Sequence, residues 1–507
     1  MSIISKSILI LRQTAALALL PLLAWSCQLV VDDYDCENNI YDDANQYINV
    51  TISVSASEDR VTRAMPNGGE YGDGIEKGNN RENEVKNVTL IFYKDNAGIN
   101  TTSDETVVAS VLSYVVRPMT ANDWDENKNH VHKNTEPTTN NNEYYGQEVL
   151  YTTGNQKLEG TLLEKGETYK MLVVANAVVD VQPGDLIKNV REKIARDVFT
   201  GTGKGTDATY FVMASEADAA VTLSNPVEET STDKTEYIYY FDCVHIERLA
   251  ARIDFSTDGG TYYDNESATD PVSGYKYILT GNRAFVLTKV TPFNLYNENE
   301  YLFKRVCTGY TSSEGSYTAN SISYLGDETT VADPILNKKA NNYVVDPHTT
   351  GKDNTNAFTY LSPIAEIMNN AYSYSTATEQ SDVAFTVCYA KENTLMPTSY
   401  LKNYATGIAF TGEYYPNGID GTHETRTYYH YIRHQGEKTG VNDDIYNAKQ
   451  WNELAADKAS TANTPMNIGI VRNNIYRISI KGEGEGTLHV VVQETKWRHV
   501  DNPTIYL

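Results

Sequence analysis

Two histidines, His430 and His434, stand four residues apart, a spacing that on a helix would place both imidazoles on one face for a metal ion. Tyr431 occupies the position where a zinc-protease motif has its general base, and the tyrosine-rich surroundings favour a strand. No serine-nucleophile, phosphate-loop or dinucleotide motif lies between a strand and a helix, and the many carboxylates are typical of a solvated surface. The sequence therefore predicts no catalytic residue, no metal site and no cofactor, and the chain is not expected to be an enzyme.

The thiol of Cys27 could carry a different chemistry, the acylation of a bacterial lipoprotein. Lys6 and Arg12 precede an apolar run that ends at Leu23, which is short for a membrane span and typical of a secretory signal over residues 1–26. Ala24 stands where such signals usually have leucine, so ordinary signal cleavage remains the alternative. The cysteines show no CxxC spacing of the kind that binds metal. Cys27 is the expected acylation site and Cys36 lies in the leader. The other three cysteines can form at most one disulfide, and they are Cys243, Cys307 and Cys388.

Two arginines, Arg60 and Arg63, offer peptide bonds to a trypsin-like protease. They precede a stretch rich in Asn, Gly and Glu that runs to Glu84 and has too little apolar surface to order itself. The sequence therefore predicts a flexible, cleavable loop. Cleavage there would separate the segment before the loop from the rest of the chain.

That preceding segment is the clearest strand of the chain. Ile48, Val50, Ile52 and Val54 alternate with polar residues, which predicts one face in a core and the other in water. A β-sandwich that loses such a strand keeps an apolar groove that can accept a strand of another chain. The C-terminal region could supply that strand through its apolar residues Leu488, Val490, Val492, Trp497, Val500, Ile505 and Leu507. In the alternative, the first strand stays in place in a monomer and the C-terminal strand pairs within its own sheet.

Composition sets the wider frame. The 507 residues include 42 Lys and Arg against 67 Asp and Glu, a formal charge of −25 that repels nucleic acid. The 38 tyrosines outnumber 11 phenylalanines, and Thr and Asn are abundant, which favours half-solvated strands joined by polar loops. An all-β, extracellular protein of two or more domains is expected.

The elements that must position these residues are short strands. A helix is expected at Asp185–Asp197, a short one at Trp451–Leu454, and a domain boundary in the polar passage Ser224–Lys234. Two stacked β-sandwiches are predicted, with further strands at Val88–Tyr93, Thr106–Val116, Lys170–Val178, Thr209–Met213, Tyr237–Ile246, Ile246–Phe255, Tyr277–Leu287, Ala384–Tyr389, Gly407–Tyr414, Asn474–Lys481 and Thr487–Trp497.

A series of motifs along the chain resembles the Bacteroidales type V pilins, the fimbrillins of major and minor fimbriae, and in particular their shaft subunits. They span nearly the whole chain, and their order and spacing are more specific than any single motif. The motifs are the signal ending at Cys27, Tyr47–Ser55 followed by Thr62-Arg63-Ala64, Glu82–Tyr93, Tyr169–Ala177, Glu247–Phe255, Tyr389–Asn393 and Ile470–Ile478.

This resemblance implies a lipoprotein precursor held at the outer membrane by its lipid, cut by an Arg-specific protease and polymerised by donor-strand exchange into an adhesive fimbria. Motif position places the cut at Arg63–Ala64, with Arg60 as the second choice. Other copies of the chain, and tip and anchor subunits, would be its partners. The implied segments are a signal over 1–26, a lipidated leader with the first strand over 27–63, and two transthyretin-like sandwiches over 64–235 (the acceptor) and 236–507, with the donor strand at 487–507.

Three departures from the family pattern keep other functions open. They are Ala24 in the signal, Cys36, and a long insertion rich in Asn and Thr near residue 130. Acidic leaders with a second cysteine also occur in related anchor subunits, which stay lipidated and uncut. A tip or anchor subunit is one alternative. A monomeric outer-membrane lipoprotein that binds glycan or protein through tyrosine-rich loops is the other.

Overall fold

The computed structural model describes a large part of the chain, and its contacts divide the protein into Met1–Asn45 and Gln46–Leu507. All elements named below belong to the second unit. The described residues are 45–54, 80–94, 106–119, 150–215, 219–232, 234–256, 262–263, 277–280, 283–307, 322–324, 343–349, 352, 372–373, 384–395, 399, 401–418, 421–432, 446–453, 468–484 and 487–496.

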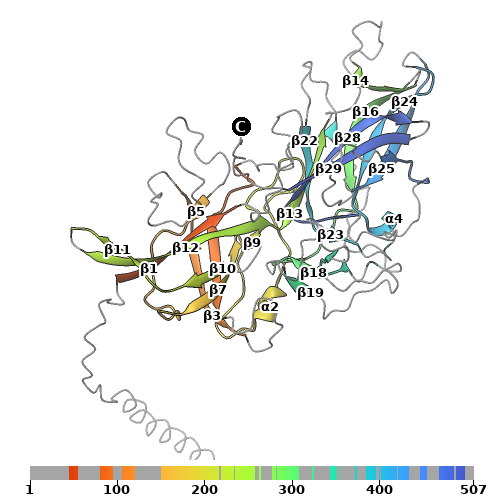
Figure 1. The fold of residues 1–507 in the computed structure, drawn as a ribbon. Helices are drawn as coiled ribbons and strands as arrows, with labels where there is room; N and C mark the ends of the chain where they lie inside the picture. The colour runs from red at the N-terminus through yellow and green to blue at the C-terminus, as the bar shows by residue number, and fades with distance from the viewer. Residues whose placement is uncertain are drawn as a thin grey trace, which may run out of the picture. The chain divides into compact units, whose positions relative to one another are not determined.

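Eleven strands form the first hydrogen-bonded sheet (Figure 1). Its path runs β3-β2-β7-β9-β12-β1-β5-β4, with β10 on β7, β11 on β12 and β6 on β1. The strands are β1 (Gln46–Ser53), β2 (Asn87–Tyr93), β3 (Val108–Val115), β4 (Arg117–Pro118), β5 (Leu150–Thr152), β6 (Gln156–Lys157), β7 (Thr168–Ala175), β9 (Met213–Ser215), β10 (Ala219–Thr222), β11 (Val227–Thr230) and β12 (Thr235–Arg248).

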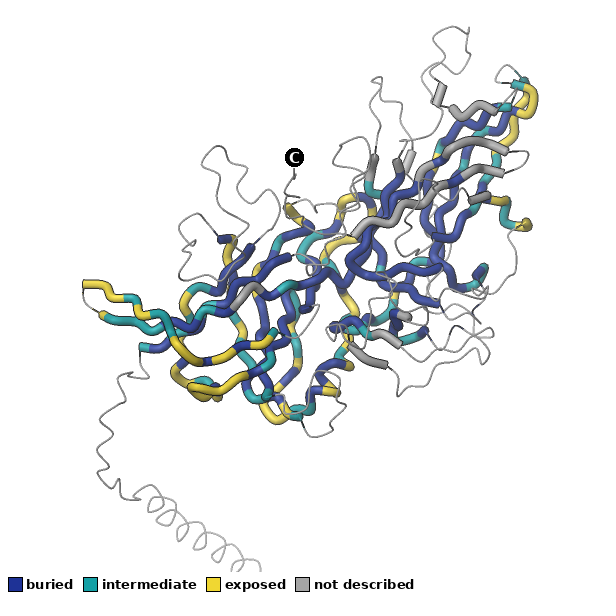
Figure 2. The backbone as a smooth tube through the Cα atoms, in the orientation of Figure 1, coloured by how far each residue is buried: buried dark blue, intermediate teal, exposed yellow. Residues whose placement is uncertain are grey.

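The long strand β12 joins the two halves of this sheet. Its first part pairs with β1, and its last three residues pair with β9. Phe241 of β12 contacts Phe92 of β2, with ring centroids 6.5 Å apart, and both belong to one buried cluster with Ile48 of β1. The two halves therefore enclose a common core, and Figure 2 shows exposed residues gathered at the β11 hairpin and the turns.

Two further sheets share a second core. Phe255 of the five-stranded sheet and Phe410 of the six-stranded sheet have ring centroids 5.9 Å apart, so the sheets pack face to face. The first runs β22 (Ala384–Lys391), β13 (Ala250–Ser256), β28 (Asn474–Gly484), β29 (Thr487–Lys496) and β26 (Tyr446–Ala448). The second runs β14 (Tyr262–Tyr263), β15 (Tyr277–Thr280), β16 (Arg283–Phe293), β24 (Gly407–Tyr415) and β25 (Glu424–Tyr431), with β21 (Tyr372–Ser373) on β16.

The remaining elements are short. Strand β8 (Ile194–Ala195) pairs with β17 (Glu300–Tyr301), and β23 (Asn393–Thr394) pairs with β27 (Gly469–Ile470). Strands β18 (Arg305–Cys307), β19 (Ile322–Tyr324) and β20 (Tyr343–Val344) form a small sheet, and α2 (Ile187–Arg191) and α4 (Leu401–Tyr404) are helical. The predicted all-β fold class is confirmed. Within the described ranges, no helix is long and apolar enough to cross a membrane.

Several predicted elements differ from the structure. The strand expected at Ile246–Phe255 divides at Leu249 between the end of β12 and β13, and the strand expected at Tyr277–Leu287 is instead the antiparallel pair β15 and β16. The helix expected at Asp185–Asp197 shrinks to α2, because Leu186 at its N-terminal cap makes no side-chain hydrogen bond and the chain soon pairs as β8. The strand expected at Thr209–Met213 begins only at Met213 as β9, because Tyr210 adopts a left-handed backbone with φ of 50°.

The polar passage Ser224–Lys234 is not a bare connection. It contains β11, which forms a hairpin with β12 and places Val227 opposite Ile238. The predicted domain division at residues 235/236 stays a prediction. The short helix expected at Trp451–Leu454 is instead a turn over residues 451–453, and Leu454 lies outside the described residues.

Candidate functional site

Strand β1 lies inside its sheet and not at an edge (Figure 1). On one side it runs parallel to β12, from Gln46 opposite Tyr237 to Ser53 opposite His245. On the other side it runs antiparallel to β5 and β6. Taking β1 away would leave an opening one strand wide, with unpaired backbone groups along both of its sides. We call this opening, now filled by β1, the β1 seat.

The apolar face of β1 supplies the core beneath the seat. Ile48, Val50, Ile52 and Val54 are all 0% exposed, as the period-two pattern predicts. The other face was expected in water, and this is wrong for Thr51 and Ser53, which are buried. This end of β1 pairs with β5 and with the later part of β12, and the side chains on both of its faces are buried.

The side of the seat formed by β5 and β6 is interrupted by a turn at Gly154, which has φ of +63°. The side chains of Thr152, Thr153 and Asn155 around this turn contact β1, and we call them the polar bay. Asn49 donates its amide Nδ2 to Asn155 Oδ1 at 2.9 Å and accepts at Oδ1 from Thr152 Oγ1 at 2.8 Å. The backbone N–H of Val50 donates to Thr153 Oγ1 at 3.1 Å. These side chains therefore add to the backbone pairing here, where the Thr153 N–H donates to the Val50 carbonyl at 3.1 Å.

Glu82 lies inside the stretch to Glu84 that was expected to be a flexible loop, and that expectation is wrong for this end of the stretch, because Glu82 and Asn83 are buried. Glu82 is held independently of β1. Its side chain is fully buried, lies 3.1 Å from the Arg252 guanidinium and accepts a hydrogen bond from the Tyr389 hydroxyl. Its backbone carbonyl accepts from Arg248 Nε at 2.9 Å. Burial lowers the pKa of Arg248 to about 10, although the Glu82 carboxylate opposes this. This clamp holds the chain that follows the predicted cut to β12, β13 and β22.

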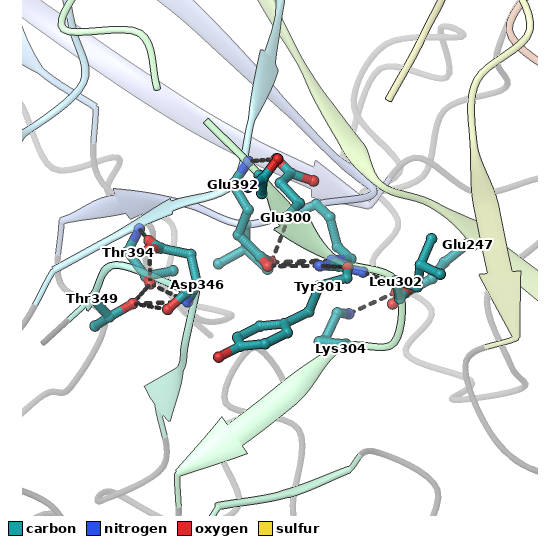
Figure 3. A network of polar contacts seen from close by, with 12 residues as sticks. Glu247, Glu300, Tyr301, Leu302, Lys304, Asp346, Thr349, Glu392 and Thr394 are labelled. Carbon is teal, nitrogen blue, oxygen red and sulfur yellow. Dashed lines mark hydrogen bonds and ion pairs between the residues drawn. The ribbon is translucent and has the colours of Figure 1, made fainter. Parts of the chain in front are cut away.

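A second buried charge cluster contains Arg472, and Figure 3 labels its neighbours Glu300 and Glu392. The Arg472 guanidinium lies 3.0 Å from Glu392 Oε2 and donates to the backbone carbonyls of Tyr301 at 2.7 Å and Leu302 at 3.0 Å. The Glu300 carboxylate accepts the backbone N–H of Glu392, so two carboxyl groups share the surroundings of one arginine. The cluster therefore ties β17 to the residues that precede β23 and β28.

Nearby buried ion pairs extend this polar layer. Lys304 Nζ lies 2.7 Å from Glu247 Oε2, and Lys352 Nζ lies 2.6 Å from Asp346 Oδ2. Asp346 also accepts the backbone N–H of Thr394 at 2.8 Å (Figure 3). Each charge has a partner of opposite sign, as burial requires, and the arrangement is that of a structural network.

Glu300 predicts a pH dependence of stability. Burial, with the neighbouring Glu392 carboxylate, raises the pKa of Glu300 to about 8 against the opposing effect of Arg472. An unfolded glutamate loses its proton near pH ~4.3. Between these values the folded chain holds a proton that the unfolded chain has lost, so the free energy of unfolding falls as pH rises. Glu300→Gln is expected to remove a fall of on the order of 1–4 kcal/mol between pH 5 and 9.

Urea unfolding at pH 5, 7 and 9 measures this effect. The matched control is Glu453→Gln, at an exposed position of the turn after β26. Wild type and control are expected to lose stability with rising pH relative to Glu300→Gln. Parallel curves for all three proteins would show that Glu300 ionises normally in the folded chain.

The residues first considered for chemistry are placed only in part. His430 lies buried on β25, a strand as expected, and His434 lies outside the described residues. In the described part of the chain, no group of three or more His, Cys, Asp or Glu could hold a metal ion. Cys388 is a free buried thiol whose pKa is raised by burial.

The predicted processing residues Cys27, Arg60, Arg63 and Ala64 all lie outside the described residues, so their roles stay predictions.

The predicted donor residues fall into two groups. Leu488, Val490 and Val492 belong to β29, which pairs with β28 on one side and with β26 on the other, and the Val490 side chain is fully buried. The other group lies outside the described residues and consists of Trp497, Val500, Ile505 and Leu507. The structure therefore shows β29 in its own sheet, which is the pairing that the alternative reading of the sequence expects.

Sequence reasoning assigned no role to Glu82, Arg248, Arg252 or Arg472. A signal was available for the arginines, because each lies within or beside an otherwise apolar run. A charged residue at such a position is expected to be paired when the run is buried. Their acidic partners could not be named, because Glu82 lies 170 residues before Arg252, and Glu392 lies 80 residues before Arg472.

No family model and no curated protein matches the chain. Among solved structures, it is similar to a Parabacteroides distasonis protein assigned to cell adhesion (12% identity, TM-score 0.38, 89% of this chain and 99% of that one). It is also similar to a fimbrilin (14%, 0.36, 90% and 99%) and to a C-terminally truncated tip fimbrial protein (10%, 0.34, 89% and 99%), both from Porphyromonas gingivalis. The proteins in these matches are described as fimbrial or cell-adhesion proteins.

Proposed function

We propose that this chain is a structural subunit of a cell-surface fimbria, exported as a lipoprotein precursor and polymerised by donor-strand exchange after cleavage in the loop behind β1. The observation that carries the proposal is the interior position of β1, whose apolar side chains are fully buried and whose backbone is paired on both sides. An edge strand could leave without opening a seat. Removal of an interior strand leaves unpaired backbone groups and an apolar groove, and both are satisfied when another strand binds there.

The Glu82 clamp supports the same sequence of events. It holds the chain after the loop through contacts that do not involve β1. A cut at Arg63–Ala64 would therefore separate the segment that contains β1 from the rest of the chain and leave Glu82 bound. With Cys27 as the lipidation site, the released segment would carry the acyl anchor and the mature chain would leave the outer membrane. A neighbouring copy would then fill the seat with its C-terminal segment, and repetition of this contact builds a filament.

Arg63→Ala is expected to leave the precursor uncut and to abolish polymerisation, because β1 then stays in its seat. Filaments sheared from cells that produce each variant, and analysed by unheated gel electrophoresis and mass spectrometry, measure this. Arg60→Ala is the matched control and is expected to form filaments whose subunits begin at Ala64. Subunits of polymerised material that still begin at Cys27 would contradict strand removal.

One observation favours a second function, that of a subunit or surface lipoprotein that does not polymerise through its own C-terminus. Strand β29 is paired on both sides within its own sheet. A tip subunit, an anchor subunit or a monomer that binds glycan or protein through its loops would need no more than this. Such a protein gives no ladder of multimers in unheated gels, whereas a shaft subunit does.

A further inference from the structure

The pairing of β1 is irregular on both sides of the β1 seat, and the two irregular points lie at the same place along β1. The pairing with β12 shifts between Val50, which lies opposite Phe241, and Ile52, which lies opposite Val244. On the other side, the polar bay contacts β1 at Asn49 and Val50. A strand in this seat therefore meets an irregular point on each side at one place along its length.

We propose that the polar bay sets the register of any strand that replaces β1, and that Thr504 of a second copy takes the place of Asn49. This inference rests on the proposed function. Asn49 donates one hydrogen bond to the bay and accepts another. The replacing strand must therefore bring a side chain that does both, with apolar neighbours at the positions of Ile48, Val50 and Ile52.

Register matters here because the seat has one strongly apolar face. A slip of one residue would turn every apolar side chain of the incoming strand away from the core. A slip of two residues would keep the apolar face but place a different side chain in the bay. The β1–β12 irregularity and the bay resist both slips, since each fits the strand at a single position.

The C-terminal sequence contains one segment that meets these demands without taking any described strand from its sheet. Pro503-Thr504-Ile505-Tyr506-Leu507, read in the direction of β1, aligns with Ile48-Asn49-Val50-Thr51-Ile52. In this register the larger Tyr506 falls at the position of Thr51, which is buried, so the surroundings of Thr51 must move to admit its ring. A threonine hydroxyl both donates and accepts, as the bay requires. Ile505 and Leu507 then take the places of Val50 and Ile52, both of which are 0% exposed.

A rival segment has a similar pattern but a poorer starting position. Leu488-His489-Val490 would place His489 in the bay. To do so it would have to leave β28 and β26 and expose Val490, which is fully buried. The segment after β29 is therefore the favoured occupant.

The test uses the full chain with residues 60–63 replaced by the recognition sequence of a site-specific protease. After the cut, the protein is unfolded in urea, separated from the segment that contains β1, and refolded in the presence of fluorescent peptides of residues 45–56, residues 487–496 or residues 497–507, and the dissociation constants are measured. The 45–56 and 497–507 peptides are expected to bind, the second with its affinity lowered about three- to tenfold by Thr504→Val. Tyr506→Phe is the matched control and should change the affinity less than twofold.

A double-mutant cycle locates the effect. In protein carrying Thr152→Val, the loss caused by Thr504→Val in the peptide is expected to shrink to less than twofold. Unchanged affinity of the Thr504→Val peptide, or preferred binding of the 487–496 peptide, overturns the inference while leaving the proposed function in place. Failure of the cut protein to bind the 45–56 peptide as well would mean that the proposed function is wrong.

Discussion

A chain that begins at Ala64, and so lacks β1, is expected to lose about 6–12 kcal/mol of unfolding free energy. Four fully buried side chains, Ile48, Val50, Ile52 and Val54, leave the core, and each contributes roughly 1.5–3 kcal/mol. The loss is comparable with the whole stability of a typical domain, about 5–15 kcal/mol. The core around β1 should therefore fail to fold alone, and adding a peptide of residues 45–56 should restore it.

Urea unfolding followed by tyrosine fluorescence measures this loss, with and without the peptide. The matched control is a chain that begins at Asn45, which keeps β1 and should match the full-length protein. A second peptide with Val50→Asp should fail to restore the truncated chain, because it would bury an unpaired carboxylate. Equal stability of the two truncated chains would show that β1 contributes little and that no open seat follows from its loss.

Arg472→Met is expected to destabilise the protein by about 3–5 kcal/mol. The substitution keeps much of the side-chain volume but leaves Glu392 buried without its counter-charge, and breaking a buried pair from one side costs on this order. It also removes the donors to the carbonyls of Tyr301 and Leu302. The midpoint of urea unfolding at pH 7 measures the loss.

Two variants separate the charge effect from general damage. Arg426→Met breaks the solvent-accessible pair with Glu424 and is expected to cost no more than about 1 kcal/mol. Adding Glu392→Gln to Arg472→Met should recover part of the lost stability, because no uncompensated charge then remains. A double variant less stable than Arg472→Met would mean that the carboxylate of Glu392 serves another partner.

The sequence predicted most clearly those features that depend on neighbouring residues. The alternation from Ile48 to Val54 identifies β1 and its buried face because strand periodicity is local. It could not tell that β12 lies parallel on one side of β1 while β5 and β6 lie on the other. Strand periodicity is local, so it also could not identify the acidic partners of Arg252 and Arg472, which lie far away in the sequence. The left-handed backbone of Tyr210 delays the start of the strand predicted at Thr209–Met213, and residue propensity does not reveal such a conformation.

The parallel pairing of β1 with β12 also determines the order in which strands of the newly made chain can pair. Gln46 contacts Tyr239, 193 residues later, so the earliest strand to be made must wait for one of the much later ones before it can be seated. Contacts that close such long loops form slowly. Each newly made chain therefore passes through an interval in which β12 has not yet formed and β1 has no partner on that side.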